Sequence, residues 1–227
     1  MNWTPTGTNP LIVEAFDNYR SFLLRIATLY AGARLIEAVD LSALGDSFAL
    51  AISDDLPEGA TTVRTVGELK QSIQSREYGQ LALALGTIQL CTAFEILLER
   101  ISAIYGVEVD STDRFDVSHT PVAGAPPVIV TLGNRALMQI NKLHQQLSVS
   151  SPLNRPDTLL KLAAIVEARN CFTHAGGIVQ KLKQKERLWA YRIPAEVGQP
   201  LVLKDNALDD FLHFMALNAL AFVDRAP

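Results

Sequence analysis

Residues 159–177 read LLKLAAIVEARNCFTHAGG, a helix pattern that ends in a cluster of polar side chains. Pro156 and Asp157 just before it suit a helix start, because proline presets φ and a carboxylate favours the amino-terminal end of the helix dipole. Alanine, leucine and isoleucine then fill about four turns at ~3.6 residues each. Gly176 and Gly177 predict the end of the helix, since glycine readily adopts the left-handed conformation of a carboxyl-terminal cap.

Four polar residues of this predicted helix share one face. Their spacings of three, four or seven residues place them next to one another on a helix surface: Glu167, Asn170, Cys171 and His174. Arg169 points away from that face and reaches the cluster only through its long side chain. The stretch therefore predicts a helix whose last turns carry an acid, an amide, a guanidinium and an imidazole.

The segment Arg169-Asn-Cys-Phe-Thr-His174, with Glu167 before it and Gly177 after it, resembles the signature of the HEPN superfamily (higher eukaryote and prokaryote nucleotide-binding domains). Ribonuclease members of that family carry an arginine, then four to six residues, then a histidine, often with an asparagine directly after the arginine. The resemblance is strongest over residues 156–180 and extends weakly to the end of the chain. It implies a helical fold and RNA cleavage without metal or cofactor, in which the 2′-hydroxyl attacks the adjacent phosphorus and leaves a 2′,3′-cyclic phosphate.

A second copy of the same spacing, Arg114-Phe-Asp-Val-Ser-His119, lies in a proline- and glycine-rich segment without helical periodicity. A bare arginine–histidine spacing is therefore weak evidence, as any short motif is. The copy at 169–174 has the asparagine, a helix before it and glycines after it, so it is the candidate site. The alternative interpretation is an ordinary capped helix in which the arginine and the histidine are structural.

The resemblance assigns the chemistry to Arg169, Asn170 and His174. Imidazole can carry a proton near neutral pH, because its ordinary pKa is about 6.5. A guanidinium keeps its charge and offers phosphate oxygens a fork of donors. Asn170 would orient the imidazole or bind phosphate, and Glu167 would pair with Arg169 or His174. One histidine does not easily serve as both acid and base, and the family answers this by dimerising with two signature helices across a twofold axis.

Two further sets of residues are candidates for supporting roles. Glu95, in Thr-Ala-Phe-Glu95, resembles an acidic position in the second helix of some HEPN proteins, although an ordinary helix-surface glutamate explains it equally well. Lys181, Lys183, Lys185 and Arg187 alternate with other residues, so a strand would place all four cations on one face. They would track RNA phosphates or, as the alternative, protect an exposed strand edge from aggregation.

Hydrophobic periodicity predicts a mainly α fold, a bundle of about five helices with one small β-hairpin near the carboxyl-terminal end. The expected helices cover 11–39, 65–105 with a break or bend near Gly79, 134–147, 156–175 and 207–224. Thr65 and Glu68 form a capping-box pattern at the start of the second helix. The whole chain, 1–227, is expected to be one HEPN-like domain with these irregular parts: a loose amino terminus at 1–10, residues 40–64, a long loop at 106–133 with a short strand at 128–131, and the hairpin at 178–203.

Composition favours a globular domain and excludes several classes of protein. The chain has 227 residues, of which 48% are hydrophobic and 19% charged, so global disorder is excluded. The net charge of −4 argues against a generic nucleic-acid coat protein but allows a local basic patch. The large apolar fraction indicates either helices buried all round or a surface buried in an oligomer. No Walker loop, dinucleotide-binding glycine fingerprint or Gly-x-Ser-x-Gly elbow is present.

The cysteines and the other histidines point to structural roles. Cys91 and Cys171 are too few for a disulfide framework, and Cys171 is expected to be a small buried residue rather than a nucleophile. The spacings of His119, His144 and His213 do not fit a metal site, so no metal is predicted. The apolar run 81–98 contains polar residues, which indicates a core helix rather than a membrane span. With no secretory leader pattern at its start, the chain is expected to be cytoplasmic.

Two functional hypotheses follow. The first is a HEPN endoribonuclease, a toxin or defence effector that acts as a homodimer on RNA and is restrained by an antitoxin or other regulatory protein. The second is a HEPN-like module that keeps the fold for dimerisation or for binding nucleotides or RNA, without cleavage. Only the first requires Arg169 and His174 together at a shared, partly exposed surface.

Overall fold

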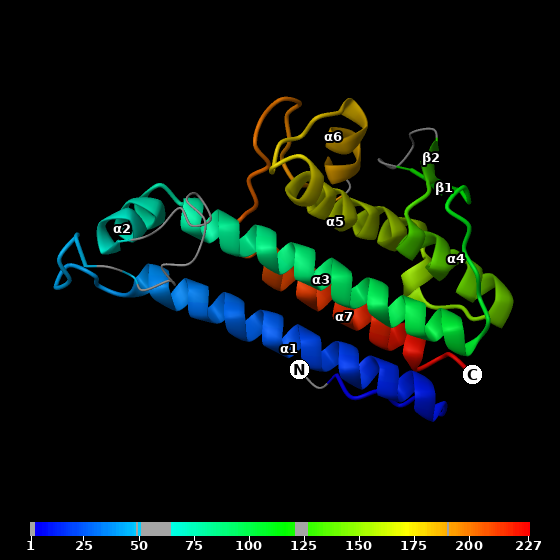
Figure 1. Cartoon of the computed structure of the whole chain (residues 1–227). Coiled ribbons are helices and arrows are strands. Elements are labelled where there is room, and N and C mark those ends of the chain that lie inside the picture. The colour runs from blue at the N-terminus through cyan, green and yellow to red at the C-terminus, as the bar shows by residue number, and fades with distance from the viewer. Residues whose placement is uncertain (1–2, 49, 51–64, 121–126, 190) are drawn as a thin grey trace.

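Five long helices form a bundle, and two short helices and one hairpin are attached to it (Figure 1). The computed structural model describes residues 3–48, 50, 65–120, 127–189 and 191–227. The long helices are α1 (Pro10–Ala38), α3 (Glu77–Ile104), α4 (Arg135–Leu147), α5 (Pro156–His174) and α7 (Ala207–Val223). The other described elements are α2 (Val66–Gln74), α6 (Leu182–Trp189), the strands β1 (Phe115–His119) and β2 (Val128–Leu132), and a 3₁₀ turn at Pro152–Asn154.

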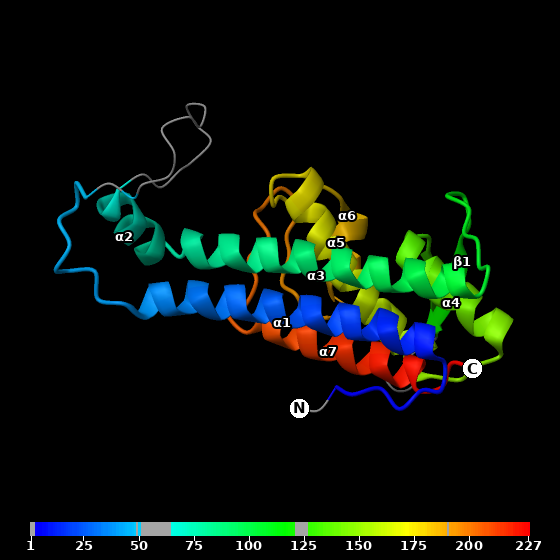
Figure 2. The same ribbon diagram turned by 60° about the horizontal axis from the view of Figure 1, so that its bottom comes forward.

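Helix α3 is the centre of the bundle, because α1, α4, α5 and α7 all pack against it (Figures 1 and 2). Its inner side carries a continuous apolar row that includes Leu90, Phe94 and Leu97. The ring of Phe94 lies 6.0 Å from that of Tyr19 on α1, which fixes the contact between the two longest helices. Among the described helices, α3 alone has the length and hydropathy of a membrane span. Its packing against four helices is that of a core helix, as expected from the polar residues in the run 81–98.

The expected helices are present, and the mainly α fold class is confirmed. The capping box is also confirmed: the Thr65 hydroxyl accepts from the Glu68 amide at 3.2 Å, and the Glu68 carboxylate accepts from the Thr65 amide at 3.1 Å. The break predicted near Gly79 in the second helix is confirmed and falls at Arg76, whose φ is +66°. Gly79 lies inside α3, where its lack of a side chain lets the Glu37 carboxylate of α1 come close. A Cβ at position 79 would lie 2.3 Å from that carboxylate.

The β-hairpin forms at a different place from the one predicted. β1 pairs antiparallel with β2, from Phe115↔Leu132 to His119↔Val128, so the segment expected to be a long loop contains the hairpin. The strand expected at 128–131 is confirmed. The strand expected through 181–187 is wrong, because α6 occupies Leu182–Trp189. The two ends of the predicted hairpin still meet at one isolated bridge, between Ile178 and Pro200.

The amino-terminal segment is held more firmly than its polar, proline-containing sequence suggests. Residues 3–9 have no helix or strand, yet the Thr6 amide donates to the Asp224 carboxylate at 2.6 Å. The Asn9 side chain donates to the Pro227 carbonyl at 3.1 Å and also caps α1 by accepting from the Leu11 amide. The described part of the predicted loose terminus therefore packs against the end of α7.

Two helical glycines provide a matched test of this packing. Gly32 on α1 has no atom within 4 Å of a built Cβ, whereas at Gly86 on α3 the Cβ would lie 2.3 Å from the buried Leu208 side chain. Gly32→Ala should raise the free energy of unfolding by roughly 0.5–1 kcal/mol, because alanine loses less backbone entropy in a helix. Gly86→Ala should lower it by about 1–3 kcal/mol, the usual range for overpacking. Urea denaturation followed by circular dichroism measures both, and equal effects at the two sites would contradict the α3–α7 contact.

Candidate functional site

Helix α5 ends where the sequence predicts, and its end places His174 at the surface. The amides of Ala175 and Gly177 both donate to the Cys171 carbonyl, at 3.2 and 2.9 Å. Gly176 and Gly177 have φ values of +57° and +82°, the left-handed conformation that glycine adopts without strain. His174 is the last helical residue and is exposed, and its imidazole makes no hydrogen bond or ion pair with any described residue.

Arg169 is fixed by an ion pair that crosses from one central helix to the other. Its Nη2 atom donates to the Oε1 atom of Glu95 on α3, and both side chains are largely buried. Hydrogen bonds between charged groups are short and strong, so this pair fixes the direction of the guanidinium. Glu95, on α3, is thus the ion-pair partner of Arg169 in the structure.

The polar face predicted on α5 runs from the core to the surface. Glu167 is 5% exposed and Cys171 is fully buried, whereas Asn170 is half-buried and His174 is exposed. Arg169 and His174 thus lie little more than one helical turn apart, one anchored to α3 and the other open to solvent. Asn170 lies between them in the sequence, and its side chain makes no hydrogen bond to a described residue.

Glu167 has a different partner from either one expected. Its Oε2 atom accepts from Nη1 of Arg187 on α6 at 2.9 Å, so it pairs with neither Arg169 nor His174. A buried carboxylate without a counter-charge would be costly, and Arg187 supplies that charge. The pair ties α6 to α5, and Arg187 is therefore a structural cation in this arrangement.

The four cations predicted to share one strand face are separated by the α6 helix. Lys185 pairs with Glu196 at 2.7 Å and Arg187 with Glu167, whereas Lys181 and Lys183 are exposed and make no ion pair within the described chain. The helix forms because its residues, mostly Lys, Gln, Glu, Leu and Arg, are strong helix formers and none is β-branched. The Gln184 side chain also caps its start by accepting from the amides of Gln180 and Lys181.

The remaining histidines are held in structural contacts or lie away from the signature. His119, the end of the second arginine–histidine spacing, lies on β1 with its Nδ1 atom 3.1 Å from the Asp157 carboxylate. His144 is buried between the Ile140 carbonyl and the Ser151 hydroxyl, each 2.7 Å away, and burial lowers its pKa. His213 is half-buried on α7. The arginine–histidine spacing at 114–119 is not helical, as expected, but it lies at strand β1 of the hairpin and not in the long loop that was predicted.

Both cysteines are buried thiols rather than nucleophiles. Burial raises the pKa of Cys91 to about 12, and it raises that of Cys171 to about 11 with a smaller contribution from Glu167. A thiol reacts as its thiolate, so neither is reactive near neutral pH. The expectation that Cys171 fills space in the core is confirmed by its burial.

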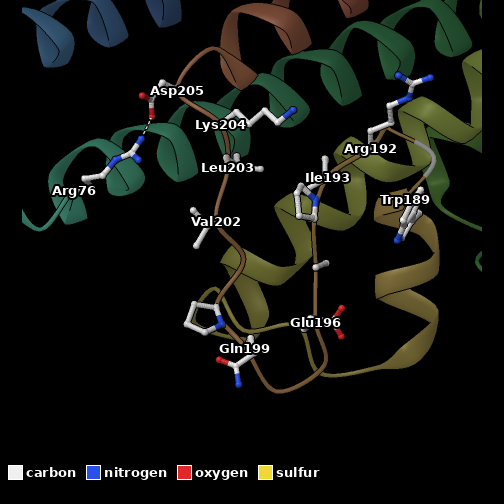
Figure 3. Close-up of a pocket in the computed structure, with 13 residues that line it drawn as sticks. Arg76, Trp189, Arg192, Ile193, Glu196, Gln199, Val202, Leu203, Lys204 and Asp205 are labelled. Atoms are coloured by element: carbon white, nitrogen blue, oxygen red, sulfur yellow. Dashed lines mark hydrogen bonds and ion pairs between the residues drawn. The ribbon is translucent and has the colours of Figure 1, made fainter.

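A groove that the sequence analysis missed lies beside the end of α5 (Figure 3). It has a volume of about 910 Å³ and is lined by the end of α6, by the segments 192–196 and 199–205, and by Arg76. The segment 198–201 is bonded back to the cap of α5: the Leu201 amide donates to the Gly177 carbonyl at 2.7 Å, and the Val179 amide donates to the Gln199 carbonyl at 3.0 Å. The available signal was the pair Pro194 and Pro200 around Gly198, which predicts a turn but not a groove.

No protein-family model, curated protein or solved structure matches the chain.

A stability measurement can separate the structural role of Arg187 from a role in RNA binding. Arg187→Leu leaves the Glu167 carboxylate buried without its partner, so the free energy of unfolding should fall by roughly 2–4 kcal/mol, near the range for broken buried pairs. The double variant Glu167→Gln/Arg187→Leu should recover most of that loss, and Lys183→Gln on the exposed side of α6 should change it by less than about 0.5 kcal/mol. Chemical denaturation of the four proteins checks this, and an Arg187→Leu variant as stable as Lys183→Gln would contradict the pairing.

Proposed function

We propose that the chain is a metal-independent endoribonuclease of the HEPN type. The observation that carries the proposal is the placement of Arg169 and His174 on adjacent turns of α5, with the guanidinium directed by Glu95 and the imidazole exposed at the helix end. Phosphoryl chemistry on RNA requires a cation for the phosphate and a proton carrier near neutral pH, and these two side chains supply them.

In the proposed reaction His174 takes the proton of the ribose 2′-hydroxyl or delivers one to the leaving 5′-oxygen. The 2′-oxygen forms a bond to phosphorus as the bond from phosphorus to the 5′-oxygen breaks, which leaves a 2′,3′-cyclic phosphate and a free 5′-hydroxyl. Arg169 offers its remaining donors to the phosphate oxygens, and Asn170 orients the imidazole or holds an oxygen. Glu95 acts through Arg169 and is a positioning residue. Lys181 and Lys183 are the two exposed cations of the predicted RNA-binding set that remain free of ion pairs in the described chain.

The second candidate function is a non-catalytic HEPN-like module for dimerisation or for binding nucleotides or RNA. It is favoured by one observation, the ion pair itself, because Glu95 neutralises part of the Arg169 charge. In either function we propose a cytoplasmic protein, and for the enzyme a toxin or defence effector with an antitoxin or regulatory protein as partner. The two candidates are distinguished by cleavage.

His174→Ala should reduce RNA cleavage by about 10²–10⁴-fold, the usual contribution of a positioned acid or base. Arg169→Lys should also lose most activity, because an ammonium keeps the charge but not the fork of donors. Purified protein on mixed cellular RNA provides the assay, read for discrete cuts and cyclic-phosphate ends, with circular dichroism as the check on folding. EDTA should leave the rate unchanged.

His119→Ala is the matched control, since it removes the histidine of the other arginine–histidine spacing and should not alter cleavage. Equal cleavage by wild type and His174→Ala would eliminate the enzyme and the assigned site together. Binding of RNA without cleavage by the wild type would favour the second candidate.

The proposed assembly is a twofold homodimer with α5 near the axis, because one imidazole does not readily act as both acid and base. The exposed Thr173, next to His174, should then lie close to its counterpart in the second copy. Thr173→Cys should form a disulfide-linked dimer under mild oxidation, since the two native cysteines are buried, and Thr28→Cys on the exposed side of α1 should not. Light scattering at micromolar concentration checks the mass, and a monomer there would contradict the assembly.

A further inference from the structure

The groove beside α5 has the size of a ligand site and a wall made of extended chain. Its volume of about 910 Å³ lies within the ~300–1,000 Å³ that is typical of small-molecule sites. Figure 3 shows Trp189 and Arg192 on one side of it, Val202 and Lys204 on the facing segment, and the pair formed by Arg76 and Asp205 at the far end.

The charges that line the groove leave an excess of cations. Asp205 is neutralised by Arg76, and Glu196 is neutralised by Lys185 at 2.7 Å. Arg192 and Lys204 are exposed and form no ion pair with any residue in the described ranges. In a chain whose net charge is −4, two unpaired cations that line one groove favour the binding of an anion there.

The groove also carries an exposed indole. Trp189 is the last residue of α6 and is 66% exposed, an unusual position for the largest side chain in proteins. Across the groove, Val202 is exposed as well and adds apolar surface. A flat aromatic face in a groove that cations also line suits the stacking of an unpaired base and the binding of its phosphate.

The backbone at both ends of the groove is held in an unfavourable conformation. Arg76 and Arg192 have φ values of +66° and +55°, and Ser148 is the only other non-glycine residue with positive φ among those described. Such residues are uncommon, and strained positions concentrate at sites with a function. The Arg192 amide donates to the Trp189 carbonyl at 2.9 Å, so a backbone hydrogen bond joins these two residues.

We propose that this groove binds a nucleotide of single-stranded RNA, with the base stacked on Trp189 and the phosphate held by Arg192 and Lys204. Single-stranded RNA is the occupant because a duplex keeps its bases stacked on one another and offers no free face to the indole. The choice of RNA rests on the proposed function. The groove wall is bonded to the cap of α5, the helix that ends at His174, through the Leu201 amide and the Gly177 carbonyl.

The test is a fluorescence titration in the Trp3→Phe background, which leaves Trp189 as the one remaining tryptophan of the two in the chain. The probes are a single-stranded octanucleotide and a blunt duplex, both with 2′-O-methyl riboses that remove the nucleophile and prevent cleavage. The octanucleotide should quench the fluorescence of Trp189, and it should bind more tightly than the duplex. The affinity should fall as the salt concentration rises, and the logarithm of the binding constant should fall by about 0.7 per unit of log salt concentration for each phosphate contact.

Binding by the variants is followed with labelled octanucleotide and fluorescence anisotropy. Trp189→Ala should weaken binding by roughly 5- to 150-fold, the range for one stacked base. Arg192→Gly/Lys204→Gln should weaken binding and reduce the salt slope by about 0.7, the value for one phosphate, and glycine at position 192 relieves the positive φ, so the fold is retained. Arg100→Gln, an exposed cation near the far end of α3, is the control and should bind as wild type.

Failure of this proposal is distinct from failure of the proposed cleavage. Unchanged affinity in both groove variants would overturn the groove assignment. Equal affinity for the duplex would also overturn it, because binding would then not depend on unpaired bases. Equal affinity for poly-glutamate would overturn it too and would indicate a protein partner. Groove-dependent binding by a wild type that cuts no RNA would support the groove and remove the cleavage proposal.

Discussion

Acidic side chains inside apolar helices must be neutralised where they lie, and this requirement organises the side of the bundle that contains α5. Helices α3 and α5 each place a glutamate in a largely buried position, Glu95 and Glu167. Each takes an arginine from the next element, Arg169 from α5 and Arg187 from α6, because a buried charge is tolerated only with a partner. The two ion pairs thus connect α3, α5 and α6 in series, and the segment that follows α6 forms the groove.

Much of the fold could be predicted because it depends on local patterns. The apolar repeat of α1, the capping box of α2 and the glycine cap of α5 are each determined by residues within a few positions of one another. The candidate site is also local, since Arg169 and His174 share one helix. The partner of Glu167 could not be predicted, because Arg187 is 20 residues away and reaches it only when α6 has formed.

The segment 181–189 illustrates how two periodicities can compete in a short stretch. Cations at every second position fit a strand, yet residues four apart also share a helix face. Helix propensity and the Gln184 cap decide the outcome locally, and burial of Leu188 then fixes α6 against the domain. The groove could not be predicted at all, because it is bounded by segments from residues 76 to 205 that are brought together only by tertiary packing.

Main-chain amides of Ala175 and Gly177 close α5, so the helix end does not depend on the imidazole of His174. A substitution at position 174 can therefore alter the chemistry of this turn without loss of the fold. Positions 167 and 187 behave in the opposite way, since either one changed alone leaves the other charge buried and unpaired. Sequence change in this domain is thus free at position 174 and constrained to paired changes at positions 167 and 187.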